Sequence, residues 1–258
     1  MRCVGMIPVR MASTRFPGKP LVRILGLTML EHVYRRARLC PLLEEVMIAT
    51  CDAALRLEAE RLGAPVIMTS ERHQRAAERV AEAAAQTDAD VVVMIQGDEP
   101  LLHPQMLEEL VVPLQAESEV HCTNLMLEIG EADARDPDQV KVVCDTTGNA
   151  LYMSRGALPA CSAGRTTERW WRQIGLIAFR RSFLLQLMSL PPTPLERAES
   201  IDMLRAIEYG FKVRMVPTRH ATHPVDTPED IATVEALMQD DPLLELYTPP
   251  MHRVLGGT

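Results

Sequence analysis

Apolar runs and amphipathic segments alternate along the first part of the chain. Short apolar runs predict strands at Cys3–Pro8, Glu45–Thr50, Val66–Met68 and Asp90–Gln96. Segments with apolar residues on one helical face predict helices at Met29–Leu39, Ala53–Leu62, Glu78–Gln86 and Pro104–Ala116. This alternation predicts an α/β fold whose mostly parallel central sheet is covered by helices on both faces. Ligands of such sheets bind beyond the carboxyl ends of the strands.

The second half of the chain departs from this pattern. Two strand-like runs, Val140–Asp145 and Ala150–Ser154, are joined by T-T-G-N, which is typical of a hairpin. The remaining predicted elements are strands at Ile174–Arg180 and Lys212–Pro217 and helices at Leu184–Met188, Ser200–Tyr209 and Pro228–Met238. We therefore expect one domain over residues 1–239, with a small β-hairpin-containing subdomain at about 140–175, followed by a Pro-rich tail over 240–258.

Composition restricts the classes of partner. The 258 residues carry a formal net charge of −8, which argues against a broad nucleic-acid surface, so an anionic ligand needs a local cationic cluster. No apolar run approaches the roughly 20 residues that a membrane helix needs, and the N-terminus lacks a signal-peptide layout. The six Cys residues form no C-x-x-C pair, which favours free thiols over a zinc site. We expect a cytoplasmic protein without nucleic-acid or membrane partners.

A cationic loop follows the first predicted strand. Arg10, Arg15 and Lys19 lie there among small or hydroxylated residues such as Ser13, together with Gly18. Guanidinium groups form bidentate hydrogen bonds with phosphate oxygens, and a Lys adds a compact positive charge. Small residues let backbone N–H groups approach the phosphate closely. The G-x-x-x-x-G-K-[ST] spacing of a Walker A loop is absent. The loop therefore predicts a polyphosphate site of another kind.

Two aspartates stand at positions that suit a divalent cation. Asp98 follows the apolar strand in V-V-V-M-I-Q-G-D-E-P, and Asp226 precedes a predicted helix in P-V-D-T-P-E-D. A lone Asp before a helix often only complements the helix dipole. Two carboxylates together with phosphate oxygens, however, make a complete Mg²⁺ site. The sequence therefore predicts Mg²⁺ held by Asp98 and Asp226.

These sequence motifs resemble those of a known family. The run R-M-A-S-T-R-x-P-G-K-P-L at 10–21 resembles the N-terminal signature of the CMP-Kdo synthetases, the 3-deoxy-manno-octulosonate (Kdo) cytidylyltransferases, and G-D-E-P and V-D-T-P-E-D resemble that family's metal-binding segments. Further matches are P-D-Q-V-K-V-V at 137–143, A-L-Y-M-S-R at 150–155 and P-P-T-P-L-E-R-A-E-S at 191–200, so the likeness spans about residues 3–238. It implies a Rossmann-like nucleotidyltransferase fold, a homodimer that uses the region 140–174, and CTP with Mg²⁺.

The resemblance and the loop chemistry together predict a set of residue roles. The catalytic set is Arg10, Lys19, Asp98 and Asp226, with Asp98 and Asp226 as metal ligands. The residues expected to bind CTP are Arg10, Met11, Ala12, Ser13, Arg15, Lys19 and Gln96. An oxygen of the acceptor would attack the α-phosphorus in line, and pyrophosphate would leave.

Departures from the family pattern gather at positions that would bind the acceptor. Gln173 and Ile177 stand where the family usually has His and Tyr, Asp202-Met203 replaces Glu-Gln, and H-x-S-G-T-(D/E)-R becomes H-Q-R-A-A-E-R at 73–79. Loss of groups that pair sugar hydroxyls, with the gain of Arg75, favours a small anionic acceptor such as phosphonoformate. The predicted acceptor residues are Arg75, Arg79, Gln96, Gln173 and Asp202. The alternatives are a true CMP-Kdo synthetase and a catalytically inactive nucleotide-binding protein.

Overall fold

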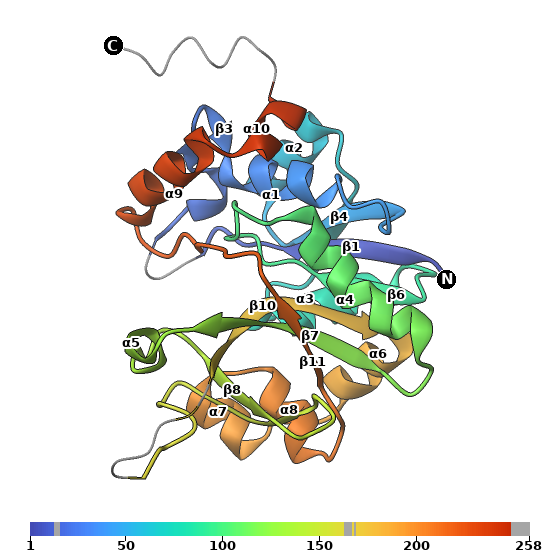
Figure 1. Cartoon of the computed structure of the whole chain (residues 1–258). Coiled ribbons are helices and arrows are strands. Elements are labelled where there is room, and N and C mark those ends of the chain that lie inside the picture. The colour runs from blue at the N-terminus through green and yellow to red at the C-terminus, as the bar shows by residue number, and fades with distance from the viewer. Residues whose placement is uncertain (13–15, 163–166, 168, 249–258) are drawn as a thin grey trace.

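The computed structural model describes residues 1–12, 16–162, 167 and 169–248 (Figure 1). Within this part of the chain, nine strands form the main sheet, whose path runs β11-β7-β10-β6-β1-β4-β5, with β8 and β9 attached through β10. The strands on the path are β1 (Cys3–Pro8), β4 (Glu45–Thr50), β5 (Val66–Met68), β6 (Val91–Met94), β7 (Cys122–Ile129), β10 (Trp170–Arg180) and β11 (Arg214–Thr218). The attached pair is β8 (Lys141–Cys144) and β9 (Ala150–Ser154).

Strand directions confirm the predicted mostly parallel sheet. β1 pairs in parallel with both β4 and β6, β4 pairs in parallel with β5, and β11 pairs in parallel with β7. β10 is antiparallel to both β6 and β7. It therefore separates the parallel strands β6, β1, β4 and β5 from the parallel pair β7 and β11. β7 was not predicted from the sequence. It is buried between β10 and β11 and accounts for the join between the two halves.

Helices cover both faces of the sheet, as the sequence predicted. They are α1 (Met29–Ala37), α2 (Ala53–Leu62), α3 (Ala76–Ala85), α4 (Pro104–Ala116), α5 (Glu131–Ala134), α6 (Arg181–Ser189), α7 (Pro194–Glu199), α8 (Met203–Glu208), α9 (Asp230–Gln239) and α10 (Pro242–Tyr247). A short 3₁₀ helix, η1 (Lys19–Leu21), and the ribbon of β2 (Arg23–Ile24) and β3 (Leu27–Thr28) precede α1.

Alternating residues of β1 show how the two cores form. Cys3 and Ile7 pack in one cluster with residues of α1, α2 and α4, whereas Val4 and Met6 pack in a second cluster with residues of α3, α6 and α8. Successive side chains of a strand point to opposite faces, so a strand that is apolar throughout needs a helical layer on each side. A smaller third cluster joins Ile24 to Val225 and residues of α9.

The predicted hairpin is confirmed, while several element ends differ. β8 and β9 pair antiparallel, and Gly148 in their connection has a φ of +81°. β10 begins at Trp170, so both tryptophans are strand residues. The helix expected over 200–209 begins only at Met203, because Ser200 adopts a left-handed φ of 56° after α7. Among the described residues, no helix is long and apolar enough to cross a membrane.

Candidate active site

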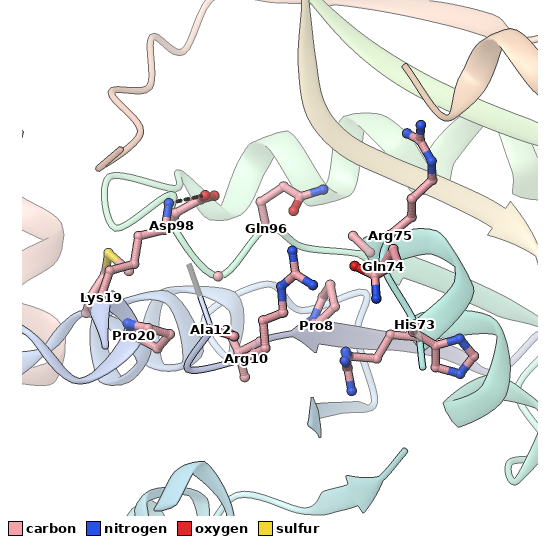
Figure 2. Close-up of a pocket in the computed structure, with 15 residues that line it drawn as sticks. Pro8, Arg10, Ala12, Lys19, Pro20, His73, Gln74, Arg75, Gln96 and Asp98 are labelled. Carbon is pink, nitrogen blue, oxygen red and sulfur yellow. Dashed lines mark hydrogen bonds and ion pairs between the residues drawn. The ribbon is translucent and has the colours of Figure 1, made fainter. Parts of the chain in front are cut away.

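A cavity of about 270 Å³ opens at the carboxyl ends of β1 and β6 (Figure 2). The loop after β1, the turn after β6 and the segment before α3 all contribute to its wall. This is the edge at which α/β sheets hold their ligands. The lining residues are Pro8, Val9, Arg10, Ala12, Lys19, Pro20, Met29, His73, Gln74, Arg75, Ala76, Arg79, Gln96, Gly97 and Asp98.

Gly97 permits the close approach of the two loops that form this edge. A Cβ atom placed on Gly97 would lie 2.3 Å from Val9 Cγ1 and 3.4 Å from the carbonyl oxygen of Pro8. Any larger residue would therefore push the turn after β6 away from the end of β1. The absence of a side chain at Gly97 brings Asp98 next to the cationic loop.

Lys19 connects the two predicted metal ligands. Its Nζ donates to Asp98 Oδ2 at 2.7 Å, to the carbonyl oxygen of Val225 at 2.8 Å and to Asp226 Oδ1 at 3.2 Å. The loop that carries Asp226 is held in place because Val225 N donates to the carbonyl oxygen of Asp98 at 2.9 Å. Asp98 and Asp226, 128 positions apart in the sequence, therefore meet at one ammonium group.

The charges around Lys19 favour its protonated form. Burial acts to lower the pKa of Lys19, but the carboxylates of Asp98 and Asp226 outweigh it and hold that pKa above its ordinary value. The Lys19 side chain is only 13% exposed. The cluster thus holds one firmly charged cation between two acids at the rim of the cavity.

The rest of the cationic loop is described in part. Arg10 and Ala12 line the cavity, and Met11 is fixed because its backbone N–H donates to Asp52 Oδ2 at 2.8 Å. Gly18 N donates to the carbonyl oxygen of Met11 at 3.1 Å, and this bond closes the loop. Ser13 and Arg15, which the sequence analysis placed on CTP, lie outside the described residues.

Gln96 is held in position by its contact with β10. Its Nε2 donates to the carbonyl oxygen of Gly175 at 3.2 Å. A Cβ atom on Gly175 would lie 2.8 Å from Gln96 Cγ, so Gly175 leaves the space that the Gln96 side chain occupies. This contact is the structural reason for a glycine at position 175.

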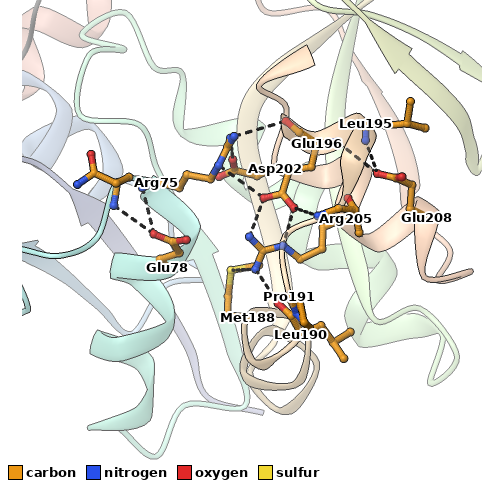
Figure 3. A network of polar contacts seen from close by, with 12 residues as sticks. Arg75, Glu78, Met188, Leu190, Pro191, Leu195, Glu196, Asp202, Arg205 and Glu208 are labelled. Atoms are coloured by element: carbon orange, nitrogen blue, oxygen red, sulfur yellow. Dashed lines mark hydrogen bonds and ion pairs between the residues drawn. The ribbon is translucent and has the colours of Figure 1, made fainter. Parts of the chain in front are cut away.

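Arg75 does not offer an unpaired charge to the cavity. Its Nη1 donates to Asp202 Oδ1 at 2.5 Å, and its Nε lies 3.5 Å from Glu196 Oε1 (Figure 3). Glu196 is buried and also accepts two bonds from Arg205, at 2.6 and 2.7 Å. Burial raises the pKa of Asp202, while Arg75 and the backbone N–H of Ala77 oppose that rise. The expectation that Arg75 was gained for an anionic acceptor therefore loses its simplest support, because Asp202 already neutralises it.

The other predicted acceptor residues separate. Arg79 is buried at the wall of the cavity, where its Nη1 donates to Thr69 Oγ1 at 2.5 Å. Gln173 lines a different cavity, and its Nε2 donates to Asn124 Oδ1 at 2.9 Å. Asp202 turns towards Arg75 instead. The five residues thus do not form one continuous surface: Arg75, Arg79 and Gln96 line the first cavity, and Gln173 lines the second.

The second cavity, of about 450 Å³, lies on the side of Asp226 and contains a residue that the sequence analysis missed. Glu99 lines this cavity and is buried. Burial, and then the charge of Asp98, raise the pKa of Glu99 to about 8, so its carboxyl group is mostly protonated at neutral pH. Because Glu99 is mostly neutral, two acidic groups near Lys19, Asp98 and Asp226, carry negative charge rather than three. The sequence signal that could have identified Glu99 is its position directly after Asp98.

The donor set at Lys19 fits a hard divalent cation. Mg²⁺ prefers carboxylate and phosphate oxygens and usually retains several waters, so two protein carboxylates suffice. Asp98 Oδ2 and Asp226 Oδ1 already face a common cation, the ammonium of Lys19. Within the described residues there is no group of three or more His, Cys, Asp or Glu side chains arranged to hold a metal. The Asp pair is the position at which the residues fit Mg²⁺.

The sheet order defines an α/β fold, with a cavity lined by Arg10, Lys19 and Arg75 at the carboxyl ends of its strands. The chain belongs to the cytidylyltransferase family, whose model matches residues 4–215. It is 45% identical to the 3-deoxy-manno-octulosonate cytidylyltransferase of Nitratidesulfovibrio vulgaris strain Hildenborough, covering 93% of this chain and 97% of that protein. The protein of that name from Geobacter metallireducens is 41% identical, with 91% and 96% covered. The resemblance to CMP-Kdo synthetases is thereby confirmed.

A solved structure supports the same assignment of fold. The structure of CMP:2-keto-3-deoxy-manno-octonic acid synthetase complexed with CTP aligns with a TM-score of 0.88 at 34% identity, covering 93% of this chain and 99% of that one. A cytidylyltransferase structure from Leptospira borgpetersenii aligns with a TM-score of 0.64 at 20% identity and shows the shared fold. The predicted Rossmann-like nucleotidyltransferase fold is confirmed.

Proposed function

We propose that this enzyme transfers CMP from CTP to a sugar acid of the 3-deoxy-manno-octulosonate type and releases pyrophosphate. The observation that carries the proposal is the meeting of Lys19, Asp98 and Asp226 within 3.2 Å at the cavity rim, in a chain 45% identical to a relative with that name. The solved neighbour with 34% identity was complexed with CTP, which supports CTP as the donor.

Arg10 and Lys19 would bind the triphosphate. Both line the cavity, and their charges would offset the charge that builds up on the phosphate oxygens as pyrophosphate leaves. Mg²⁺, held by Asp98 and Asp226, would polarise the α-phosphate and favour the ionised form of an attacking hydroxyl. Gln96, fixed by Gly175, would orient the acceptor oxygen for in-line attack on the α-phosphorus.

The acceptor is where the sequence analysis and the comparisons favour different answers. The sequence favoured a small anionic acid, because groups that would pair sugar hydroxyls are replaced and Arg75 adds a cation. Its pairing with Asp202 weakens that reasoning, and the names of the relatives support the sugar acid, which the sequence analysis kept as its alternative. Ile177 and Met203, two other departures, are buried in the core and so supply packing at those positions.

A pyrophosphate-release assay tests the proposal directly. The purified enzyme is incubated with CTP and Mg²⁺ and with either Kdo, phosphonoformate or no acceptor. We expect kcat/KM with Kdo to exceed that with phosphonoformate by at least about a hundredfold, because sites that pair substrate hydroxyls discriminate by up to about 10⁴–10⁵. Without an acceptor we expect only background release. Release with phosphonoformate alone would restore the original expectation. Binding of CTP without turnover of either acid would favour the inactive nucleotide-binding alternative.

The homodimer implied by the resemblance and the cytoplasmic location expected from the composition stay predictions. Light scattering coupled to size-exclusion chromatography tests the first, and fractionation of the source cells tests the second. A monomer at micromolar concentration would contradict the expected use of the region 140–174 as a dimer contact.

A further inference from the structure

The ammonium of Lys19 has no hydrogen atom left for a ligand. An ammonium group carries three N–H donors, and three oxygens accept from it: Asp98 Oδ2 at 2.7 Å, Val225 O at 2.8 Å and Asp226 Oδ1 at 3.2 Å. Figure 2 shows the nitrogen at the tip of the Lys19 side chain next to the Asp98 carboxylate. In this arrangement Lys19 serves the two carboxylates and not a phosphate.

A divalent cation held by both aspartates would need the space between their carboxylates. Mg²⁺ binds oxygen at about 2.0–2.1 Å, so an ion bound to Asp98 and Asp226 together would lie close to the position that the ammonium now occupies. Two cations cannot share that position, because they would repel each other at a distance below about 3 Å in a partly buried site. Metal binding therefore requires that Lys19 leave the two carboxylates.

The Lys19 ammonium has an alternative position inside the cavity. Lys19 also lines the cavity, and its four-carbon side chain can swing the ammonium from the rim towards the interior without a change in η1. A triphosphate in the cavity would offer several anionic oxygens in exchange for the two carboxylates. The loss of Lys19 from the carboxylates would in turn leave two acids side by side, which attracts a dication.

We propose that Lys19 is a placeholder for the metal: its ammonium occupies the metal position while no nucleotide is bound. A bound nucleotide triphosphate would pair with the ammonium instead and so free that position for the metal. This rests on the proposed function, in that it takes Asp98 and Asp226 as the metal ligands. The consequence is an order of binding: the dication binds together with the nucleotide and only weakly ahead of it. By linkage, whatever removes Lys19 strengthens metal binding by the same factor by which metal weakens the hold on Lys19.

The test measures metal binding without nucleotide. Free Mn²⁺ is followed by electron paramagnetic resonance while it is titrated with the wild-type protein and with Lys19→Met. We expect Lys19→Met to bind Mn²⁺ at least about tenfold more tightly, a difference of about 1.4 kcal/mol. Equal or weaker binding by Lys19→Met would overturn the placeholder role. The experiment contains no acceptor, so an error in the proposed acceptor leaves its result unchanged.

Matched variants separate direct occupation from a general change in charge. Lys212→Met removes an exposed positive charge, and Arg10→Met removes one that lines the same cavity but lies apart from Asp98 in Figure 2. Both are expected to bind Mn²⁺ within about twofold of wild type, less than the tenfold step expected of Lys19→Met. Combining Lys19→Met with Asp98→Asn should abolish the gain. A gain in Arg10→Met as large as in Lys19→Met would contradict the proposal.

A stability measurement covers the case in which Lys19→Met folds poorly. The variant leaves two carboxylates without their common cation, so its melting temperature without metal should fall below that of wild type. Millimolar Mg²⁺ should restore it, whereas the wild-type melting temperature should barely change, because a ligand stabilises only the fold that binds it. Equal Mg²⁺ responses of the two proteins would count against the proposal. Lys19→Gln, with a neutral polar side chain, should respond as Lys19→Met does.

Discussion

The Arg75 guanidinium lies against the Asp202 carboxylate, with 2.5 Å between Nη1 and Oδ1, and joins the residue before α3 to the residue before α8. The two residues are 127 positions apart. Glu196 and Arg205 extend the contact into a network of two acids and two cations (Figure 3). The network fastens the α7–α8 segment to the nucleotide side of the sheet, next to the first cavity.

Loss of Arg75 should destabilise the fold through Asp202. Arg75→Ala leaves a largely buried carboxylate without its partner, so we expect a loss of about 2 kcal/mol in the free energy of unfolding. Urea denaturation measures it. Arg75→Ala combined with Asp202→Ala should cost at least about 1 kcal/mol less than the sum of the two single changes, because the carboxylate is then absent. Strict additivity would show that the two side chains do not interact in solution.

The two proposed metal ligands should be needed for turnover. Asp98→Asn and Asp226→Asn each remove one negative oxygen from the site, and we expect each to reduce the rate of pyrophosphate release by at least about a hundredfold. Asp240→Asn, an exposed residue after α9, serves as the control for loss of an acid and should keep its rate. Wild-type rates in both site variants would end the assignment of Asp98 and Asp226 to Mg²⁺.

Gly175 should act on activity through Gln96. The added methyl group of Gly175→Ala would stand 2.8 Å from Gln96 Cγ and displace that side chain. We expect about a tenfold fall in kcat/KM, a modest value for misplaced orientation. In a Gln96→Ala background the same change should cost little more, because the displaced side chain is gone. An equal fall in both backgrounds would mean that Gly175 acts on something other than Gln96.

Stability should decrease in acid because of His32. His32 Nε2 lies 2.8 Å from the carbonyl oxygen of Ile24, which can only accept, and Nδ1 lies 3.0 Å from the Tyr247 hydroxyl. Burial lowers the pKa of His32 to about 4, with the charge of Arg36 acting in the same direction and the Ile24 carbonyl opposing it. Between pH 6.5 and about 4 the unfolded chain therefore binds a proton that the folded chain does not.

The expected result is a loss of about 2 kcal/mol in unfolding free energy between pH 7 and pH 4.5 that comes from His32 alone. His32→Gln should lose correspondingly less over this range, whereas His121→Gln, at an exposed position, serves as the matched control. Denaturant titrations at both pH values make the comparison. The same pH dependence in wild type and His32→Gln would refute the assigned role.

Element prediction succeeded where the local pattern of residue types is clear. β1, β4, β5 and α2 match their predicted bounds, and α2 stops at Gly63, whose φ is +67°. β7 was missed because its buried residues include Thr123 and Asn124, one on each face of the strand, whose polar side chains bond to distant backbone carbonyls. Thr123 Oγ1 donates to the Leu110 carbonyl, and Asn124 Nδ2 to the carbonyls of Ile174 and Leu176. α10 was missed because its Tyr247 is held by contacts with α1, including one from Arg36 Nε at 2.9 Å.

The sequence by itself determined the α/β class, the cationic loop, the two aspartates and the family, because each depends on residues that are adjacent or regularly spaced. Only the tertiary structure decided that Lys19 lies between Asp98 and Asp226, the latter 207 positions away, and that Arg75 is neutralised by Asp202. The physical reason is that a side chain's charge and hydrogen-bonding capacity follow from its own identity, whereas its partner follows from which strands the sheet places together. The sequence therefore identified the charged groups correctly and misjudged which of them were free to meet a substrate.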